Sequence, residues 1–221
     1  NMRGLQEAVR ARGVAFAAGA ASAMALSLPG YQAMAAGALT GCRDNDCPRI
    51  GVETMAERVA RGLHLTEKDV AVFASWSRLA RAATSRDGVA FVDAPEDGPP
   101  PQGGPPWRNA RFDHETFSRA RTYWEAHRPR FLHLAFLDTD EYAHQGLRAE
   151  YERALRETDA RVMEVLRWVS CPADEGLSIH MLMPCTKTQP PLHADSRDTR
   201  RGQSPASNLR TQGTSRIPVE R

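Results

Sequence analysis

The sequence lacks a surplus of charge of either sign. Its 221 residues carry 29 Lys and Arg against 27 Asp and Glu, which gives a formal net charge of +2. Residues 186–221 hold seven Lys or Arg and three Asp or Glu, so this segment carries +4 and the rest of the chain −2. Because nucleic-acid-binding proteins usually carry a basic stripe, this distribution predicts no nucleic-acid partner.

Charged residues are absent from residues 14–41. A segment of this length could span a membrane, and Arg10 and Arg12 before it are also compatible with a signal peptide. However, the segment consists largely of Ala and Gly, and Pro29 and Gly30 interrupt it with a turn signal. We therefore expect a buried strand and a helix here, with no membrane partner, and targeting sequence is the alternative.

Aromatic residues are absent from residues 186–221, which are rich in Ser, Thr, Pro, Gln and Arg. Such a segment buries too little apolar surface to offset the entropy lost on ordering. The sequence therefore predicts two regions: a partial α/β domain at residues 1–169, and a basic, low-complexity, largely disordered tail at residues 170–221.

Apolar runs typical of strands alternate with helical patterns through the first region. This alternation predicts an α/β fold with a mostly parallel sheet and helices on both faces. In such sheets, ligands bind beyond the carboxyl ends of the strands. Strands are expected at residues 14–17, 70–76, 89–92 and 130–137, with a further short strand at 177–183. Helices are expected at residues 1–12, 31–39, 54–61, 77–83, 114–127 and 147–169.

Four cysteines are present, and two of them, Cys42 and Cys47, bracket a polar turn. The pair forms either a local disulfide or two unrelated thiols. A disulfide would favour a periplasmic or secreted location; otherwise the sequence leaves the location open.

An acidic cluster follows the expected strand at residues 130–137. Within it, Asp140 precedes His144 by four residues, a spacing that brings both side chains onto one divalent metal if the segment is helical. A carboxylate and an imidazole suit zinc, manganese or a similar ion. The alternative is a polar loop with a solvated Asp140.

Ser27 stands at an expected sharp turn, residues 27–30, just before the helix expected at residues 31–39. Unpaired amides at a helix N-terminus favour a phosphate or sulfate group, and a nearby metal could activate the hydroxyl as a nucleophile. The alternative is a serine that only caps the helix.

Four ordered elements resemble the alkaline phosphatase superfamily, most closely its bacterial alkaline phosphatase family, sulfatase-like and phosphoglyceromutase-like members. Residues 27–32 resemble the Ser-Leu-Pro-(Gly/Ala)-Tyr-Gln nucleophile turn, and residues 42–47 the Cys-x-x-Asn-x-Cys loop. Residues 139–144 resemble the Thr-Asp-x-x-Ala-His metal motif, and Thr158 and Asp159 match a later Thr-Asp pair. The resemblance covers about residues 1–169.

This resemblance implies a truncated alkaline-phosphatase-like fold and a metal-dependent hydrolase of small-molecule phosphate or sulfate esters. It implies two divalent metal ions, zinc or manganese. Ser27 would be the nucleophile and a ligand of one metal, while Asp140 and His144 would bind the other. The implied reaction is in-line attack on phosphorus or sulfur between the metals. The resemblance does not decide between phosphate and sulfate, between monoester and phosphodiester, or between hydrolase and mutase. It also leaves the oligomeric state open.

Several residues that the superfamily pattern requires are missing. Glu7 is the only acidic residue before Ser27, no Asp-His-Gly segment is present, and neither His180 nor His193 lies in a matching segment. We therefore expect an incomplete hydrolase domain that binds metal weakly, as after an interruption of the reading frame near residue 169. The alternative is a non-catalytic remnant or binding module of the same fold.

Overall fold

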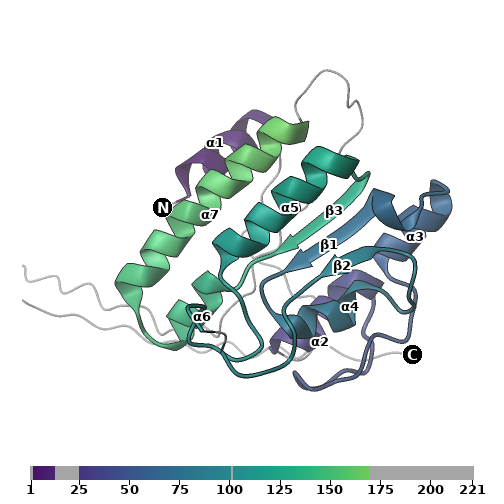
Figure 1. Cartoon of the computed structure of the whole chain (residues 1–221), viewed down its shortest axis with the longest axis horizontal. Coiled ribbons are helices and arrows are strands. Elements are labelled where there is room, and N and C mark those ends of the chain that lie inside the picture. Colours follow the sequence, from purple (N-terminus) through teal and green to yellow (C-terminus); the bar gives the residue numbers. More distant parts are fainter. Residues whose placement is uncertain (1, 13–24, 101, 170–221) are drawn as a thin grey trace, which may run out of the picture. The chain divides into compact units, whose positions relative to one another are not determined.

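The computed structural model describes residues 2–12, 25–100 and 102–169 (Figure 1). Contacts divide the chain into residues 1–188 and 189–221, so every described residue belongs to the first unit. The described elements, in chain order, are α1 (Arg3–Arg12), α2 (Ser27–Ala36), α3 (Met55–Gly62), η1 (Glu67–Asp69), β1 (Val70–Ala74), η2 (Ser77–Leu79), α4 (Ala80–Ala83), β2 (Phe91–Asp93), α5 (Asp113–His127), β3 (Phe131–Ala135), α6 (Asp138–His144) and α7 (Arg148–Val169).

The three described strands form one parallel sheet in the order β2-β1-β3. The central strand pairs on both sides, so that Val72 lies opposite Val92 of β2 and His133 of β3. All five residues of β1 are buried, as expected for an apolar run at the centre of a parallel sheet. The predicted α/β class with a parallel sheet is confirmed.

Alternate side chains of β1 enter different apolar clusters. Ala71 and Phe73 pack with Ala120 of α5. Val70 packs with residues of α3, and Ala74 packs with residues of α2 and α4. Figure 1 shows α5 on one side of the strands and α2 and α4 on the other. The described part of the sheet therefore has helices against both faces.

The start of α3 is fixed by a capping box. Thr54 N donates to Glu57 Oε2 at 2.7 Å, and Glu57 N donates to Thr54 Oγ1 at 3.3 Å. Ser85 Oγ donates to the other oxygen of Glu57 at 2.8 Å. Thr54 is therefore the N-cap of α3, and the buried Glu57 carboxylate links this helix to the segment after α4.

The bounds of the strands differ from the sequence predictions. The expected strand at residues 89–92 is β2, which begins at Phe91 because pairing with β1 begins there, opposite Ala71. The outer strand β3 ends at Ala135, two residues early, and β1 also ends two residues early. The expected strands at residues 14–17 and 177–183, and the expected disordered tail, lie outside the described residues.

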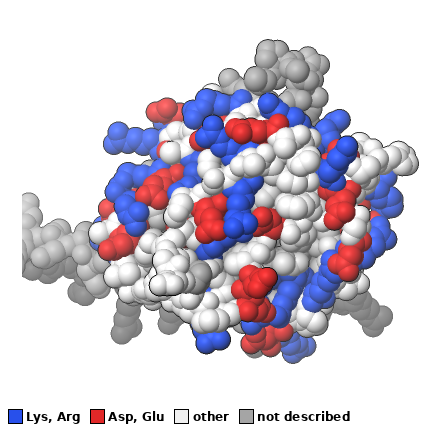
Figure 2. Space-filling view, viewed as in Figure 1, with Lys and Arg blue, Asp and Glu red and all other residues white. Residues whose placement is uncertain are grey.

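The surface carries both signs of charge. On the face shown in Figure 2, Lys and Arg side chains lie among Asp and Glu side chains. Many are paired, as in the bridges Arg121–Glu125 of α5 and Arg148–Glu152 of α7. Among the described residues, no helix combines the length and the apolar character needed to cross a bilayer.

Candidate functional site at the carboxyl edge of the sheet

Ser27 is the first residue of α2, which corrects two sequence expectations. The N-cap is Leu26, whose side chain makes no capping bond, and the helix already includes the expected turn at residues 27–30. Pro29 is tolerated because amides in the first helical turn have no acceptor within the helix. The role of Ser27 as a simple N-cap is therefore wrong.

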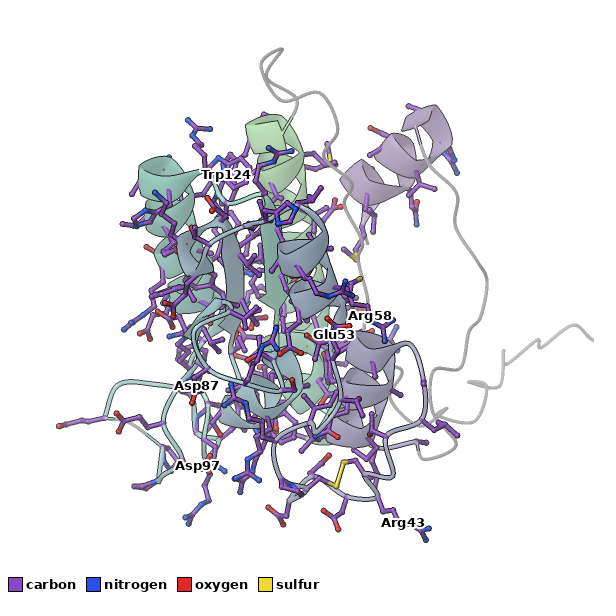
Figure 3. The ribbon with its side chains drawn as sticks, turned by 90° about the vertical axis from the view of Figure 1, so that its right-hand side faces the viewer. Arg43, Glu53, Arg58, Asp87, Asp97 and Trp124 are labelled. Carbon is purple, nitrogen blue, oxygen red and sulfur yellow. A yellow bond between two sulfur atoms is a disulfide. The ribbon has the colours of Figure 1, made fainter. Side chains whose placement is uncertain are left out.

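The N-terminus of α2 is capped from a distance by the loop that Cys42 and Cys47 close. These cysteines form a disulfide, and Figure 3 shows it beside Arg43. Leu28 N donates to Asn45 Oδ1 at 2.9 Å. This bond ties the disulfide loop, residues 42–47, to the helix that carries Ser27. Two of the four elements of the resemblance are thus in direct contact.

Few backbone amides remain free at the start of α2. Pro29 has no N–H, Leu28 N donates to Asn45, and Gly30 N donates to Leu26 O at 3.1 Å. Among the described residues this leaves the amide of Ser27 as the free N–H of residues 27–30. An anion bound at this helix end would therefore depend on side-chain donors more than the sequence predicts.

Asp140 and His144 lie together on α6. Their Nε2 and Oδ2 atoms are 3.4 Å apart, across one helical turn. Burial raises the pKa of Asp140. The nearby charge of His144 and the hydrogen bond that His144 donates both lower this pKa, but by less. The segment is helical, as the predicted approach of Asp140 and His144 requires. The alternative of a polar loop with a solvated Asp140 is wrong, because Asp140 is in a helix and its side chain is only 11% exposed.

Ser27 and the Asp140–His144 pair lie at the same end of the sheet. Leu28, next to Ser27, packs with Ala74 and Ala135, the last residues of β1 and β3. The helix that carries Asp140 begins three residues after Ala135. Figure 1 accordingly shows α6 beyond the arrowheads of the strands, and α2 beside α4 against one face of the sheet. This is the edge at which parallel α/β sheets bind ligands.

A buried carboxyl pair that sequence reasoning missed fixes the start of α6. Asp113 accepts hydrogen bonds from Leu137 N at 2.7 Å and from Asp138 N at 3.1 Å. In return, Asp113 N donates to Asp138 Oδ1 at 3.2 Å. The first residues of α5 and α6 thus cap each other. The only sequence signal was an acid in the first turn of each helix.

Burial controls the protonation of this pair. Burial raises the pKa of Asp113, although hydrogen bonds from Leu137 and Asp138 act against it. Burial and the charge of Asp113 raise the pKa of Asp138 to about 7. Two buried carboxyl groups in contact hold a proton more readily than either would alone. The mutual caps of this pair hold the start of α6, the helix that carries Asp140 two residues further on.

The Thr-Asp pair of the resemblance has a structural role on α7. Asp159 accepts hydrogen bonds from Gly4 N at 2.9 Å and Leu5 N at 2.8 Å, and so caps α1. Thr158 is 4% exposed, and its Oγ1 has no hydrogen-bond partner among the described residues. The carboxylate of Asp159 is therefore engaged with α1 rather than with the Asp140–His144 pair.

The described residues supply too few ligands for the expected metal sites. Catalytic zinc usually has three protein ligands. Within residues 2–12, 25–100 and 102–169, no group of three or more His, Cys, Asp or Glu side chains is arranged to hold a metal. Asp140 and His144 provide two donors, and Ser27 provides a hydroxyl on another helix. The described donor set does not complete either metal site.

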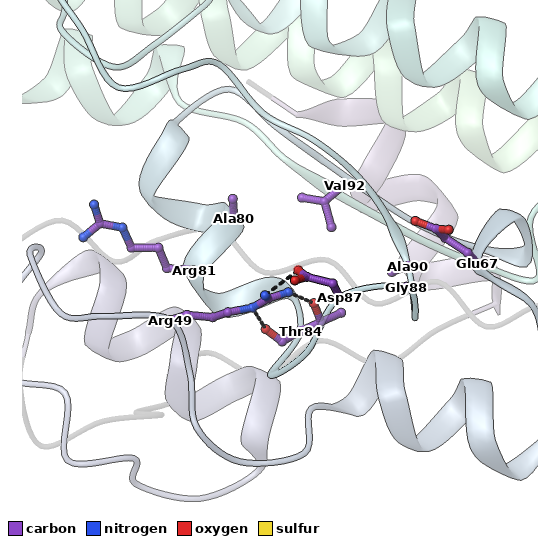
Figure 4. Close-up of a pocket in the computed structure, with 9 residues that line it drawn as sticks. All are labelled: Arg49, Glu67, Ala80, Arg81, Thr84, Asp87, Gly88, Ala90 and Val92. Atoms are coloured by element: carbon purple, nitrogen blue, oxygen red, sulfur yellow. Dashed lines mark hydrogen bonds and ion pairs between the residues drawn. The ribbon is translucent and has the colours of Figure 1, made fainter.

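Two surface hollows are separate from this edge, since none of Ser27, Asp140 and His144 lines either of them. The first, of about 410 Å³, is lined by residues that include Arg49, Thr84 and Asp87 (Figure 4). Arg49 donates to Thr84 O at 2.7 Å and to Asp87 at 2.6 Å. The guanidinium of Arg49 is thus engaged within the chain.

Comparisons of the chain with family models, with curated proteins and with solved structures found no match. The family resemblance therefore rests on the residues themselves. Of its four elements, the nucleophile turn and the disulfide loop touch each other, and the Asp140–His144 pair lies at the same edge of the sheet. The Thr-Asp pair lies on α7, where Asp159 bonds to α1.

Proposed function

We propose that the chain forms the nucleophile-bearing part of a metal-dependent hydrolase of phosphate or sulfate esters, with an alkaline-phosphatase-like fold. One observation carries the proposal: Ser27 and the Asp140–His144 pair lie at the carboxyl edge of one parallel sheet. A parallel sheet brings together residues that are far apart in sequence at this edge, and it is the usual place for ligands in α/β proteins.

Ser27 is the residue in this arrangement that can act as a nucleophile toward an ester. Its hydroxyl makes no hydrogen bond to the described residues, and the residue is half-buried at the start of α2. Activation of a serine requires a base or a metal ion. Asp140 and His144 would hold a metal if a third ligand joined them, and the metal would supply Lewis acidity. We derive no reaction step through it, because the described donor set is incomplete.

The incomplete donor set favours a second function, a non-catalytic binding module of the same fold. Two protein ligands hold zinc poorly, so this chain would retain an ester-binding edge without turnover. In both cases the Cys42–Cys47 disulfide suits an oxidising compartment, such as the periplasm or the outside of the cell.

Hydrolysis of p-nitrophenyl phosphate and p-nitrophenyl sulfate, with zinc or manganese added, tests the hydrolase. Metal-dependent turnover that disappears in Ser27→Ala supports it. Ser118→Ala, which removes an exposed hydroxyl on α5, is the matched control and should keep full activity. Absence of turnover in the wild-type chain under all conditions would leave the binding module.

Metal binding is measured separately by calorimetry. We expect weak zinc binding that is lost when Asp140→Asn and His144→Ala are combined. Combined Glu96→Gln and His114→Ala change an exposed acidic residue and an exposed histidine, and should leave the isotherm unchanged. Equal binding by both double variants would place the metal elsewhere and remove the basis for Asp140 and His144 as ligands.

A further inference from the structure

Tyr31 lies one helical turn after Ser27 on α2, and residues four apart share one side of a helix. It is 7% exposed, and its ring packs in the cluster that contains Leu28, Ala74 and Ala135. The ring is thus held at the carboxyl ends of β1 and β3. Its position is fixed by packing with the same strand ends that place Ser27 and α6.

The hydroxyl of Tyr31 has no hydrogen-bond partner among the described residues. The oxygen is not among the buried unpaired side-chain atoms of the described residues, so the hydroxyl reaches solvent although most of the side chain is buried. The carboxylates of Asp140 and Asp113 are close enough for their charges to act on the hydroxyl, yet neither accepts a hydrogen bond from it. The hydroxyl therefore has a hydrogen-bond donor that no described residue uses.

The need for a side-chain donor arises from the start of α2. Pro29 lacks an N–H, and the amides of Leu28 and Gly30 already donate to Asn45 and Leu26. A phosphate or sulfate group at Ser27 would carry three or more oxygens that accept hydrogen bonds, whereas the start of α2 offers few free backbone N–H donors. A tyrosine hydroxyl is a neutral donor that supplies a hydrogen bond without adding charge.

We propose that the Tyr31 hydroxyl donates a hydrogen bond to a non-bridging oxygen of the phosphate or sulfate group that binds at Ser27. This inference rests on the proposed function and names a residue that contacts the substrate. Ser27 and Tyr31 would then form one anion-binding unit on α2, with the nucleophilic oxygen and the donor one turn apart. The competing explanation is that the hydroxyl faces only solvent water.

Calorimetric titration of the full chain with inorganic phosphate, with and without micromolar zinc, tests this inference. Tyr31→Phe keeps the ring and removes only the hydroxyl. Since a hydrogen bond to a charged group contributes about 1.5–3 kcal/mol, the dissociation constant should rise by about tenfold or more. Tyr123→Phe is the matched control, because Tyr123 Oη donates to Lys68 O at 3.1 Å, away from Ser27. It should bind phosphate as the wild type does.

Urea unfolding without phosphate separates a ligand contact from a structural one. Loss of an unpartnered hydroxyl should leave the stability of Tyr31→Phe unchanged or slightly higher. Lower stability would show that the hydroxyl already has a partner in the free protein and would overturn the inference. Equal phosphate affinity of Tyr31→Phe and wild type would overturn it too, while leaving the proposed function intact. If the wild type binds no phosphate under either condition, both proposals fail.

Discussion

Removal of the Asp113 carboxylate should destabilise the fold by about 2–4 kcal/mol. Asp113 is fully buried, and its carboxylate accepts hydrogen bonds from the backbone amides of Leu137 and Asp138 at 2.7 and 3.1 Å. In Asp113→Ala both amides lose their acceptor, and each unsatisfied buried donor costs about 1–3 kcal/mol. Relief of repulsion between the two carboxyl groups offsets part of this loss. Since small domains are stable by only about 5–15 kcal/mol, the change is large enough to measure.

Urea unfolding at neutral pH measures this loss through the transition midpoint, with an unchanged slope. Asp87→Ala serves as the control, because the Asp87 side chain is 95% exposed and its ion pair with Arg49 lies at the surface. Its loss should be much smaller. A change in Asp113→Ala no larger than that in Asp87→Ala would refute the argument that Asp113 holds the start of α6.

The pH dependence of stability gives a second measurement on the same variant. Burial raises the pKa of Asp113 in the folded chain. As pH rises above the unfolded value of about 3.9, the unfolded chain releases a proton that the folded chain retains. The free energy of unfolding therefore falls with rising pH until the raised folded pKa is passed. In Asp113→Ala this part of the slope should disappear.

Three further changes test other parts of the structure. Mutation of Cys42 and Cys47 to Ser should lower stability by about 2 kcal/mol, the value for closure of a short loop, as measured by thermal unfolding against the oxidised wild type. The reduced wild type, which also lacks the disulfide, should unfold like the variant. Thr54→Ala should cost about 1 kcal/mol in urea unfolding. Because the hydrogen bonds to Glu57 outweigh its burial and lower its pKa, this contribution should be lost as pH falls below about 4.5 and through that lowered value. Burial lowers the pKa of His133, so stability should decline as pH falls below about 6.5, and His133→Leu should remove that decline.

The central strand and the longer helices could be predicted because the residues that they bury form recognisable patterns of apolar residues in the local sequence. The apolar run of β1 follows from burial on both faces, and α5 and α7 follow from regular spacing of apolar residues. The start of β2 could not be predicted in the same way. Val89 and Ala90 are as apolar as strand residues, but they pack in the cluster around α3 instead of pairing with β1.

The candidate site was predictable where its geometry is local. The spacing of Asp140 and His144 predicts their contact once the segment is helical. The caps that shape the site come from distant parts of the chain and leave no local pattern. Asn45 caps α2 from 17 residues away, and Asp113 caps α6 from 24 and 25 residues away. Pro29 and Gly30 were therefore interpreted as a turn, although they belong to a helix.

The cap that Asp159 provides for α1 also constrains the order of folding. The amides of Gly4 and Leu5 find their acceptor 155 and 154 residues later in the chain. During synthesis, α1 emerges before α7 and must wait until the chain has been made as far as Asp159, near the middle of α7, before this contact can form. A helix of ten residues is marginal by itself in water. Docking of α1 onto α7 should therefore be a late event on the ribosome, and it makes the first helix dependent on the last one described.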